Sequence, residues 1–61
     1  MTKEWIKDNA IYIAQRLYEL AQTNRKLKDY ETASLLATLA TDLYVGNMTE
    51  YKYELLQEWI G

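Results

Sequence analysis

Cysteine and histidine are both absent from this sequence of 61 residues. Their absence excludes disulfides, zinc sites of the finger type and nucleophilic catalysis by a thiolate or an imidazole. A chain of this length buries only about 60% of the surface that its unfolded form exposes, so it needs reinforcement. Small domains obtain it from disulfides, metals or a partner subunit, and this composition leaves the partner subunit.

Proline is missing as well, and glycine occurs only at Gly46 and Gly61. Hydrophobic residues make up 49% of the chain, with much alanine and leucine, which is typical of an all-α protein. No apolar run approaches the roughly 18 residues of a membrane span. The first residues, Met1 to Glu4, also lack the apolar core of a signal peptide. We therefore expect a cytoplasmic protein with no membrane partner.

The spacing of apolar residues predicts three helices in a single domain over residues 1–61. The helices are expected at about 3–24, 30–45 and 49–60, because apolar residues recur there at intervals of three and four. The repeating positions are Ile6, Ala10, Ile13, Leu17 and Leu20, then Ala33, Leu36, Ala40 and Leu43, and finally Tyr53, Leu56 and Ile60. The first two helices form an antiparallel hairpin, on which the short C-terminal helix docks.

Capping residues mark the ends of these helices. Thr2, Asp29 and Thr49 precede the three helices and are of the type that caps a helix N-terminus. Gly46 follows the second helix, where glycine adopts the left-handed conformation without a Cβ penalty.

The residues around the expected turn resemble one tetratricopeptide repeat. Lys28-Asp29-Tyr30-Glu31-Thr32-Ala33, followed by Ala37 and Ala40, is similar to the Gly-Asp-Tyr turn and small packing residues of that family. The resemblance covers residues 17–45, and Lys28 stands where the family has glycine. It implies a helical hairpin with a capping helix behind it. A single repeat cannot build the concave peptide groove of an array.

Charge is distributed unevenly along the chain, although the formal net charge is only -2. Residues 1–28 carry six basic and three acidic side chains, whereas residues 29–61 carry one basic and six acidic side chains. We expect this asymmetry mainly to steady oppositely charged helices packed side by side.

Catalysis and nucleic-acid binding are not expected. Ser34 has no base at a suitable spacing, and the pair Glu54 and Glu58 lacks the further ligands that a metal would need. We therefore predict no enzyme activity, no cofactor and no metal. Residues 30–45, the expected recognition helix of a helix-turn-helix, contain no basic residue for reading DNA.

Aromatic residues give the clearest functional signal. The chain has six tyrosines and two tryptophans but no phenylalanine, so every aromatic side chain carries a polar atom, as is typical of interfaces. More apolar surface is present than three short helices can cover, which indicates an association site. The candidate partner-binding residues are Trp5, Ile11, Tyr12, Tyr18, Leu55 and Trp59.

These features predict a non-enzymatic protein–protein interaction module, a small regulator or inhibitor of a larger protein that also forms a homodimer. Self-contact is expected through the aromatic and aliphatic residues of the first helix. An alternative hypothesis is an electrostatic decoy, whose acidic face occupies a nucleic-acid-binding surface of a partner enzyme. That face would comprise Asp42, Glu50, Glu54 and Glu58.

Overall fold

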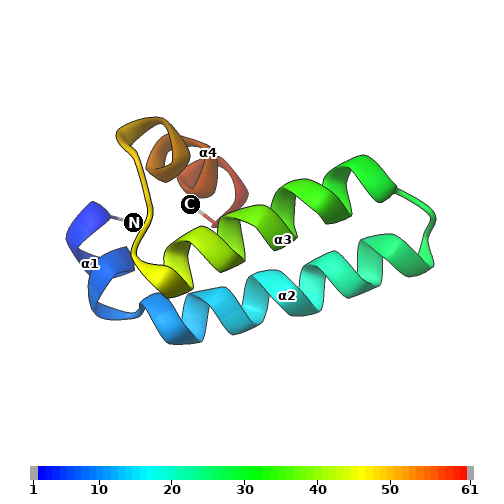
Figure 1. Cartoon of the computed structure of the whole chain (residues 1–61), viewed down its shortest axis with the longest axis horizontal. Coiled ribbons are helices and arrows are strands. Elements are labelled where there is room, and N and C mark those ends of the chain that lie inside the picture. Colours follow the sequence, from blue (N-terminus) through cyan, green and yellow to red (C-terminus); the bar gives the residue numbers. More distant parts are fainter. Residues whose placement is uncertain (1, 61) are drawn as a thin grey trace.

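Four α-helices form the chain in the computed structural model, which describes residues 2–60 apart from the side chain of Ile60. The helices are α1 (Lys3–Asp8), α2 (Ala10–Lys26), α3 (Tyr30–Val45) and α4 (Glu50–Ile60). The described residues contain no strand, so the predicted all-α class is confirmed. Figure 1 shows α2 and α3 running antiparallel, with α1 and α4 gathered at the end away from their connecting turn.

Small residues lie at the contact between α2 and α3. Ala14 and Ala21 are buried on α2, and Ala40 is buried on α3, in one cluster with Leu17 and Leu36. Alanine lets two helix backbones approach closely, and the leucines then fill the remaining space. This close packing determines which faces of the two helices point outward.

One predicted helix proved to be two. A single helix was expected over about 3–24, but the structure ends α1 at Asp8 and begins α2 at Ala10. Asn9 lies outside helical geometry, with φ -118° and ψ 26°, and its side-chain amide donates a hydrogen bond of 2.8 Å to the Trp5 carbonyl. Asparagine breaks helices in this way because its side chain competes for backbone groups. The predicted three-helix domain is thus corrected to four helices.

The helix ends carry the expected capping contacts. Thr2 accepts a hydrogen bond from the Trp5 N–H, Asp29 from the Thr32 N–H and Thr49 from the Lys52 N–H. Gly46 ends α3 in the left-handed conformation, with φ 77°. These contacts satisfy backbone groups that a helix end leaves without partners.

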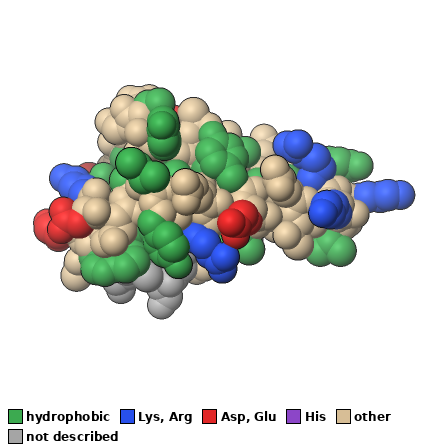
Figure 2. All heavy atoms as spheres, turned by 90° about the horizontal axis from the view of Figure 1, so that it is seen from below, with side chains coloured by type: hydrophobic (Ala, Val, Ile, Leu, Met, Phe, Trp, Pro, Cys, Tyr) green, Lys and Arg blue, Asp and Glu red, His purple; other side chains and the backbone are tan. Residues whose placement is uncertain are grey.

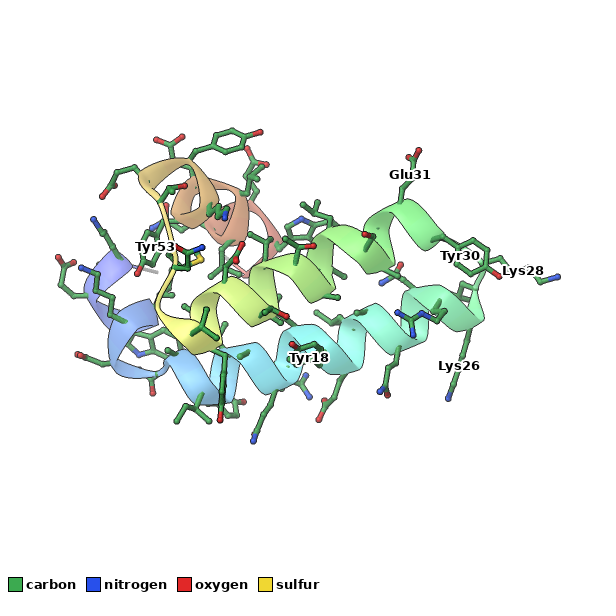
Figure 3. All side chains as sticks on the ribbon, in the orientation of Figure 1. Tyr18, Lys26, Lys28, Tyr30, Glu31 and Tyr53 are labelled. Carbon is green, nitrogen blue, oxygen red and sulfur yellow. The ribbon has the colours of Figure 1, made fainter. Side chains whose placement is uncertain are left out.

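Helix α4 docks on one end of the hairpin through a buried core and one ion pair, and a second ion pair joins it to α1. Leu56 and Tyr53 are buried in the cluster shared with α2 and α3, and Figure 3 shows Tyr53 directed inward between the helices. Lys52 Nζ lies 2.7 Å from Asp42 Oδ2. Lys3 of α1 pairs with Glu50, and its ammonium stands 5.2 Å from the centre of the Tyr53 ring. Together these contacts connect α1 and α4 to each other as well as to the hairpin.

Candidate protein-binding site

Two rows of side chains, one on each helix of the hairpin, share one side of the molecule. On α2 the row is Ile11, Tyr18 and Arg25. On α3 it is Tyr30, Ala37 and Tyr44, with the same spacing of seven residues. Seven residues make almost two full turns, so the members of each row point the same way. We call this surface the hairpin face, and it comprises Ile11, Tyr18, Arg25, Tyr30, Ala37, Thr41 and Tyr44.

A hydrogen bond between side chains joins the two rows. The Tyr18 hydroxyl lies 2.6 Å from the Thr41 hydroxyl, which brings the middle of α2 beside the C-terminal half of α3. Figure 3 shows Tyr18 lying over the seam between these helices and Tyr30 on the turn end of the same side. Tyr18 nevertheless remains 42% exposed to solvent.

The hairpin face is apolar and open to solvent. Ile11, Tyr30 and Tyr44 are 62%, 61% and 65% exposed, although each has a large hydrophobic side chain. Such side chains gathered on one surface usually mark an interaction site. Tyrosine is well suited to one, because its ring can become dry while its hydroxyl stays in water.

A shallow depression of about 490 Å³ lies along the α3 part of this surface. Small side chains form much of its lining, and Arg25 and Tyr30 are its largest members. The complete lining is Arg25, Tyr30, Ala33, Ser34, Ala37, Thr38, Thr41 and Asp42. The depression is large enough, and open enough to solvent, to accept a side chain from another protein.

The six predicted binding residues do not form a single surface. Ile11 and Tyr18 lie together on the hairpin face, whereas Tyr12 faces away from the α2 core. Ile11 and Tyr12 both line a second depression of about 510 Å³ at the corner between α1 and α2. Trp5 lies on α1. Leu55 and Trp59 lie on α4, where Leu55 is half-buried and Trp59 is exposed.

Sequence reasoning overlooked five of the seven members of the hairpin face, three of them with large side chains. Tyr30, Tyr44 and Arg25 were not among the predicted binding residues, yet they extend the face at both ends of the hairpin. The signal was present in the sequence as two matching rows with a spacing of seven, at positions 11, 18 and 25 and at positions 30, 37 and 44.

The four acidic residues of the alternative hypothesis differ in their surroundings. Asp42 and Glu50 are each engaged by a lysine, from α4 and α1 respectively. Glu54 and Glu58 are exposed on α4, and among the described residues neither forms an ion pair. Of the four predicted carboxylates, two are therefore available to a cationic partner, and the other two are already paired with lysine.

Two further properties of residues 2–60 bear on the possible kinds of site. No three acidic side chains in this range come together as a candidate metal site. None of the described helices has the length and apolarity to cross a lipid bilayer.

Comparison with protein-family models, with curated proteins and with solved structures finds no match to this chain. The functional inference therefore rests on the surfaces of the molecule.

Proposed function

We propose that the chain is a non-enzymatic protein–protein interaction module that binds a larger protein through the hairpin face and regulates or inhibits it. We also propose that the chain forms a homodimer. The observation that carries the binding proposal is the exposure of Ile11, Tyr30 and Tyr44 on one side of a rigid pair of helices. A rigid surface with exposed tyrosines loses little conformational entropy on binding.

The chemistry of the hairpin face indicates what its partner offers. The small residues of the depression leave room for one apolar side chain, and such an anchor in a pocket is a common centre of binding energy. Arg25 lies at the rim and has no ion pair among the described residues. We infer a partner segment with an apolar anchor and an acidic group beside it.

A tetratricopeptide-like hairpin is the scaffold that we propose for this face. The antiparallel α2 and α3 support it, as does the positive φ of 64° at Lys28, where that family has glycine. A lone hairpin presents its outer side, since the concave groove of this family requires several repeats.

Replacement of Tyr44 by alanine tests the proposed binding surface. A source-cell protein captured by the wild-type chain should bind Tyr44→Ala at least about 30-fold more weakly, as expected for an interface hot spot. Tyr51→Ala is the matched control, because Tyr51 is 67% exposed on α4 and lies outside the face. Circular dichroism verifies that both variants fold. Equal losses in the two variants would contradict the assignment.

Salt dependence separates this proposal from the electrostatic decoy. Binding through the hairpin face should change little when salt is added, because most of its contacts are apolar. A decoy that uses Glu54 and Glu58 should lose affinity steeply under the same conditions. The ion pairs on Asp42 and Glu50 favour the hairpin face.

A further inference from the structure

A second apolar surface lies on the other side of the hairpin, and it is exposed only near the turn. On α2, Ile13, Leu20 and Leu27 follow one another at intervals of seven, and their exposed fractions are 4%, 39% and 73%. On α3, Leu39 is 2% exposed and Leu35, one turn nearer the tip, is 36% exposed. In each row, the side chains nearer the turn are therefore more exposed to solvent.

The cause is the short reach of the covering helices. Helix α2 has 17 residues, about 25 Å at 1.5 Å per residue, whereas α1 has 6 and α4 has 11. Figure 1 shows α1 and α4 beside the end of the hairpin away from the turn, while the turn end projects beyond them. Leu20 was predicted to lie in the buried seam, and it is exposed because neither helix extends over it.

We call this second surface the tip surface, defined by Leu20, Leu27 and Leu35. On α4, Trp59 is also partly exposed, at 44%, and lies one turn beyond the buried Leu56. The hairpin face uses other residues, at positions of α2 and α3 that point to a different side. The two surfaces can therefore be altered separately.

Charge next to the tip surface is of opposite sign at its two ends. The turn end carries Lys26 and Lys28, in addition to Arg25 of the hairpin face, and Figure 2 shows the cluster of basic side chains at this end of the molecule. The α4 end carries Glu54 and Glu58. Lys26, Lys28, Glu54 and Glu58 form no ion pair among the described residues.

The acidic residues of the turn leave these cations available. Asp29 is engaged as the cap of α3. Glu31 projects to the side opposite Lys26, as Figure 3 shows. A negatively charged surface approaching the tip can therefore reach Lys26 and Lys28.

We propose that a second copy of the chain docks on the tip surface, with the two copies antiparallel about a two-fold axis. This inference rests on the homodimer of the proposed function and assigns its interface, which differs from the first-helix contact expected from sequence. Each tip then lies beside α4 of the other copy. Leu20, Leu27 and Leu35 of one copy cover the same residues of the other.

Charge complementarity makes a second copy a suitable occupant. In a two-fold dimer every contact occurs twice, so both basic tips meet an acidic α4. A parallel pairing would instead place tip against tip and α4 against α4, where like charges repel. The chain thus supplies both the apolar surface and its charged complement.

The size of the surface also permits a dimer. A standard interface takes about 800 Å² from each partner, which is about a fifth of the 4320 Å² that this chain exposes. Figure 1 shows that the turn half of the hairpin projects beyond α1 and α4, and the exposed side chains of this half are where this area would come from.

Sedimentation velocity of the full chain tests the apolar part of the proposal. The wild type should be a dimer at micromolar concentration, and Leu27→Glu should weaken dimerisation at least about tenfold through loss of apolar burial. Leu27→Ser is a second variant without added charge and should act in the same direction. Tyr44→Glu, on the hairpin face, is the matched control and should remain dimeric.

A charge exchange tests the antiparallel arrangement. Lys26→Glu/Lys28→Glu makes both ends of the chain acidic, and Glu54→Lys/Glu58→Lys makes both ends basic. Each variant alone should dimerise more weakly than the wild type, whereas an equimolar mixture should form a heterodimer, because tip and α4 are then of opposite sign at both contacts. Adding salt should reduce this preference.

The results distinguish this proposal from the proposed binding function. Three results would each overturn the tip-surface dimer. The wild-type chain could stay monomeric, Leu27→Glu could leave the dimer intact, or the mixture of charge variants could dimerise no more strongly than each variant alone. In each case the effect of Tyr44→Ala on binding of a larger protein is still measurable. Loss of that effect, with dimerisation intact, would overturn the hairpin face alone.

Discussion

Lys28 is the one non-glycine residue with a positive φ among residues 2–60. It follows α2 in the geometry that Gly46 adopts after α3. Its N–H donates to the Arg25 carbonyl, and the Asp29 N–H donates to the Asn24 carbonyl, which is the bonding pattern of a Schellman cap. For lysine the left-handed conformation costs about 1–2 kcal/mol, because Cβ approaches the following carbonyl oxygen.

Lys28→Gly should therefore stabilise the chain. Removal of the Cβ contact outweighs the greater freedom that glycine brings to the unfolded state, so the free energy of unfolding should rise by about 0.5–1 kcal/mol. Urea denaturation at submicromolar concentration measures the change. Lys26→Gly, within the last turn of α2, should instead lower stability by about 1 kcal/mol. A loss of stability in Lys28→Gly would refute the account of the turn.

Lys3 provides a prediction about pH. Its hydrogen bond with Glu50 raises the pKa of Lys3 above the ordinary value of 10.5. Because the folded state holds the proton more firmly, the resulting stabilisation is complete below pH 10.5 and is lost as the pH rises through the folded pKa. Lys3→Arg stays charged throughout this range.

The difference in urea midpoint between wild type and Lys3→Arg should be constant up to pH 10.5 and should grow above it, in favour of Lys3→Arg. Parallel curves across the whole alkaline range would show that the ion pair does not contribute to folding.

At the scale of elements, apolar spacing predicted where helices occur but not where one of them breaks. Ile6, Ala10, Ile13 and Leu17 keep their spacing across Asn9, and a break at a single residue leaves that pattern intact. Only the residue type of Asn9 carried the signal. Spacing also could not show how far α4 extends, so Leu20 was assigned to the core.

The candidate site was also predictable from the sequence only in part. Ile11 and Tyr18 were identified because apolar residues on the flank of an amphipathic helix are either covered or available for binding. Tyr30 and Tyr44 were passed over, because their side of α3 becomes adjacent to Tyr18 only when the two helices pair in the register that the Tyr18–Thr41 contact shows. That register is a property of tertiary packing.

Helix α1 should depend on one side chain for its docking. Ile6 is fully buried, and a helix of six residues has no stability of its own. Ile6→Ala should lower the free energy of unfolding by about 2–5 kcal/mol through a cavity in the core. Ile11→Ala removes the same atoms from an exposed position and should change stability by less than about 0.5 kcal/mol. Similar urea curves for the two variants would contradict the placement of α1.

At the scale of the whole molecule, dimerisation and stability are linked. The described chain measures 32 × 19 × 19 Å, so its core is thin, and a partner that binds only the folded form stabilises it by mass action.

The melting temperature should accordingly rise with protein concentration, by about 5 °C for each tenfold increase, since mass action supplies about 0.7 kcal/mol per chain. Leu27→Glu should melt at a lower temperature than the wild type at each concentration where the wild type is dimeric. Calorimetry at several concentrations checks both expectations, and a wild-type melting temperature independent of concentration would exclude a dimer in that range.

The two tryptophans offer an optical consequence of this architecture. Trp5 lies on α1 and Trp59 on α4, so α2 and α3 contain tyrosine as their only aromatic fluorophore. Indole emission therefore reports whether the covering helices are in place and is insensitive to events confined to the hairpin. A red shift with unchanged helical circular dichroism would identify a chain whose covering helices have detached while its hairpin remains folded.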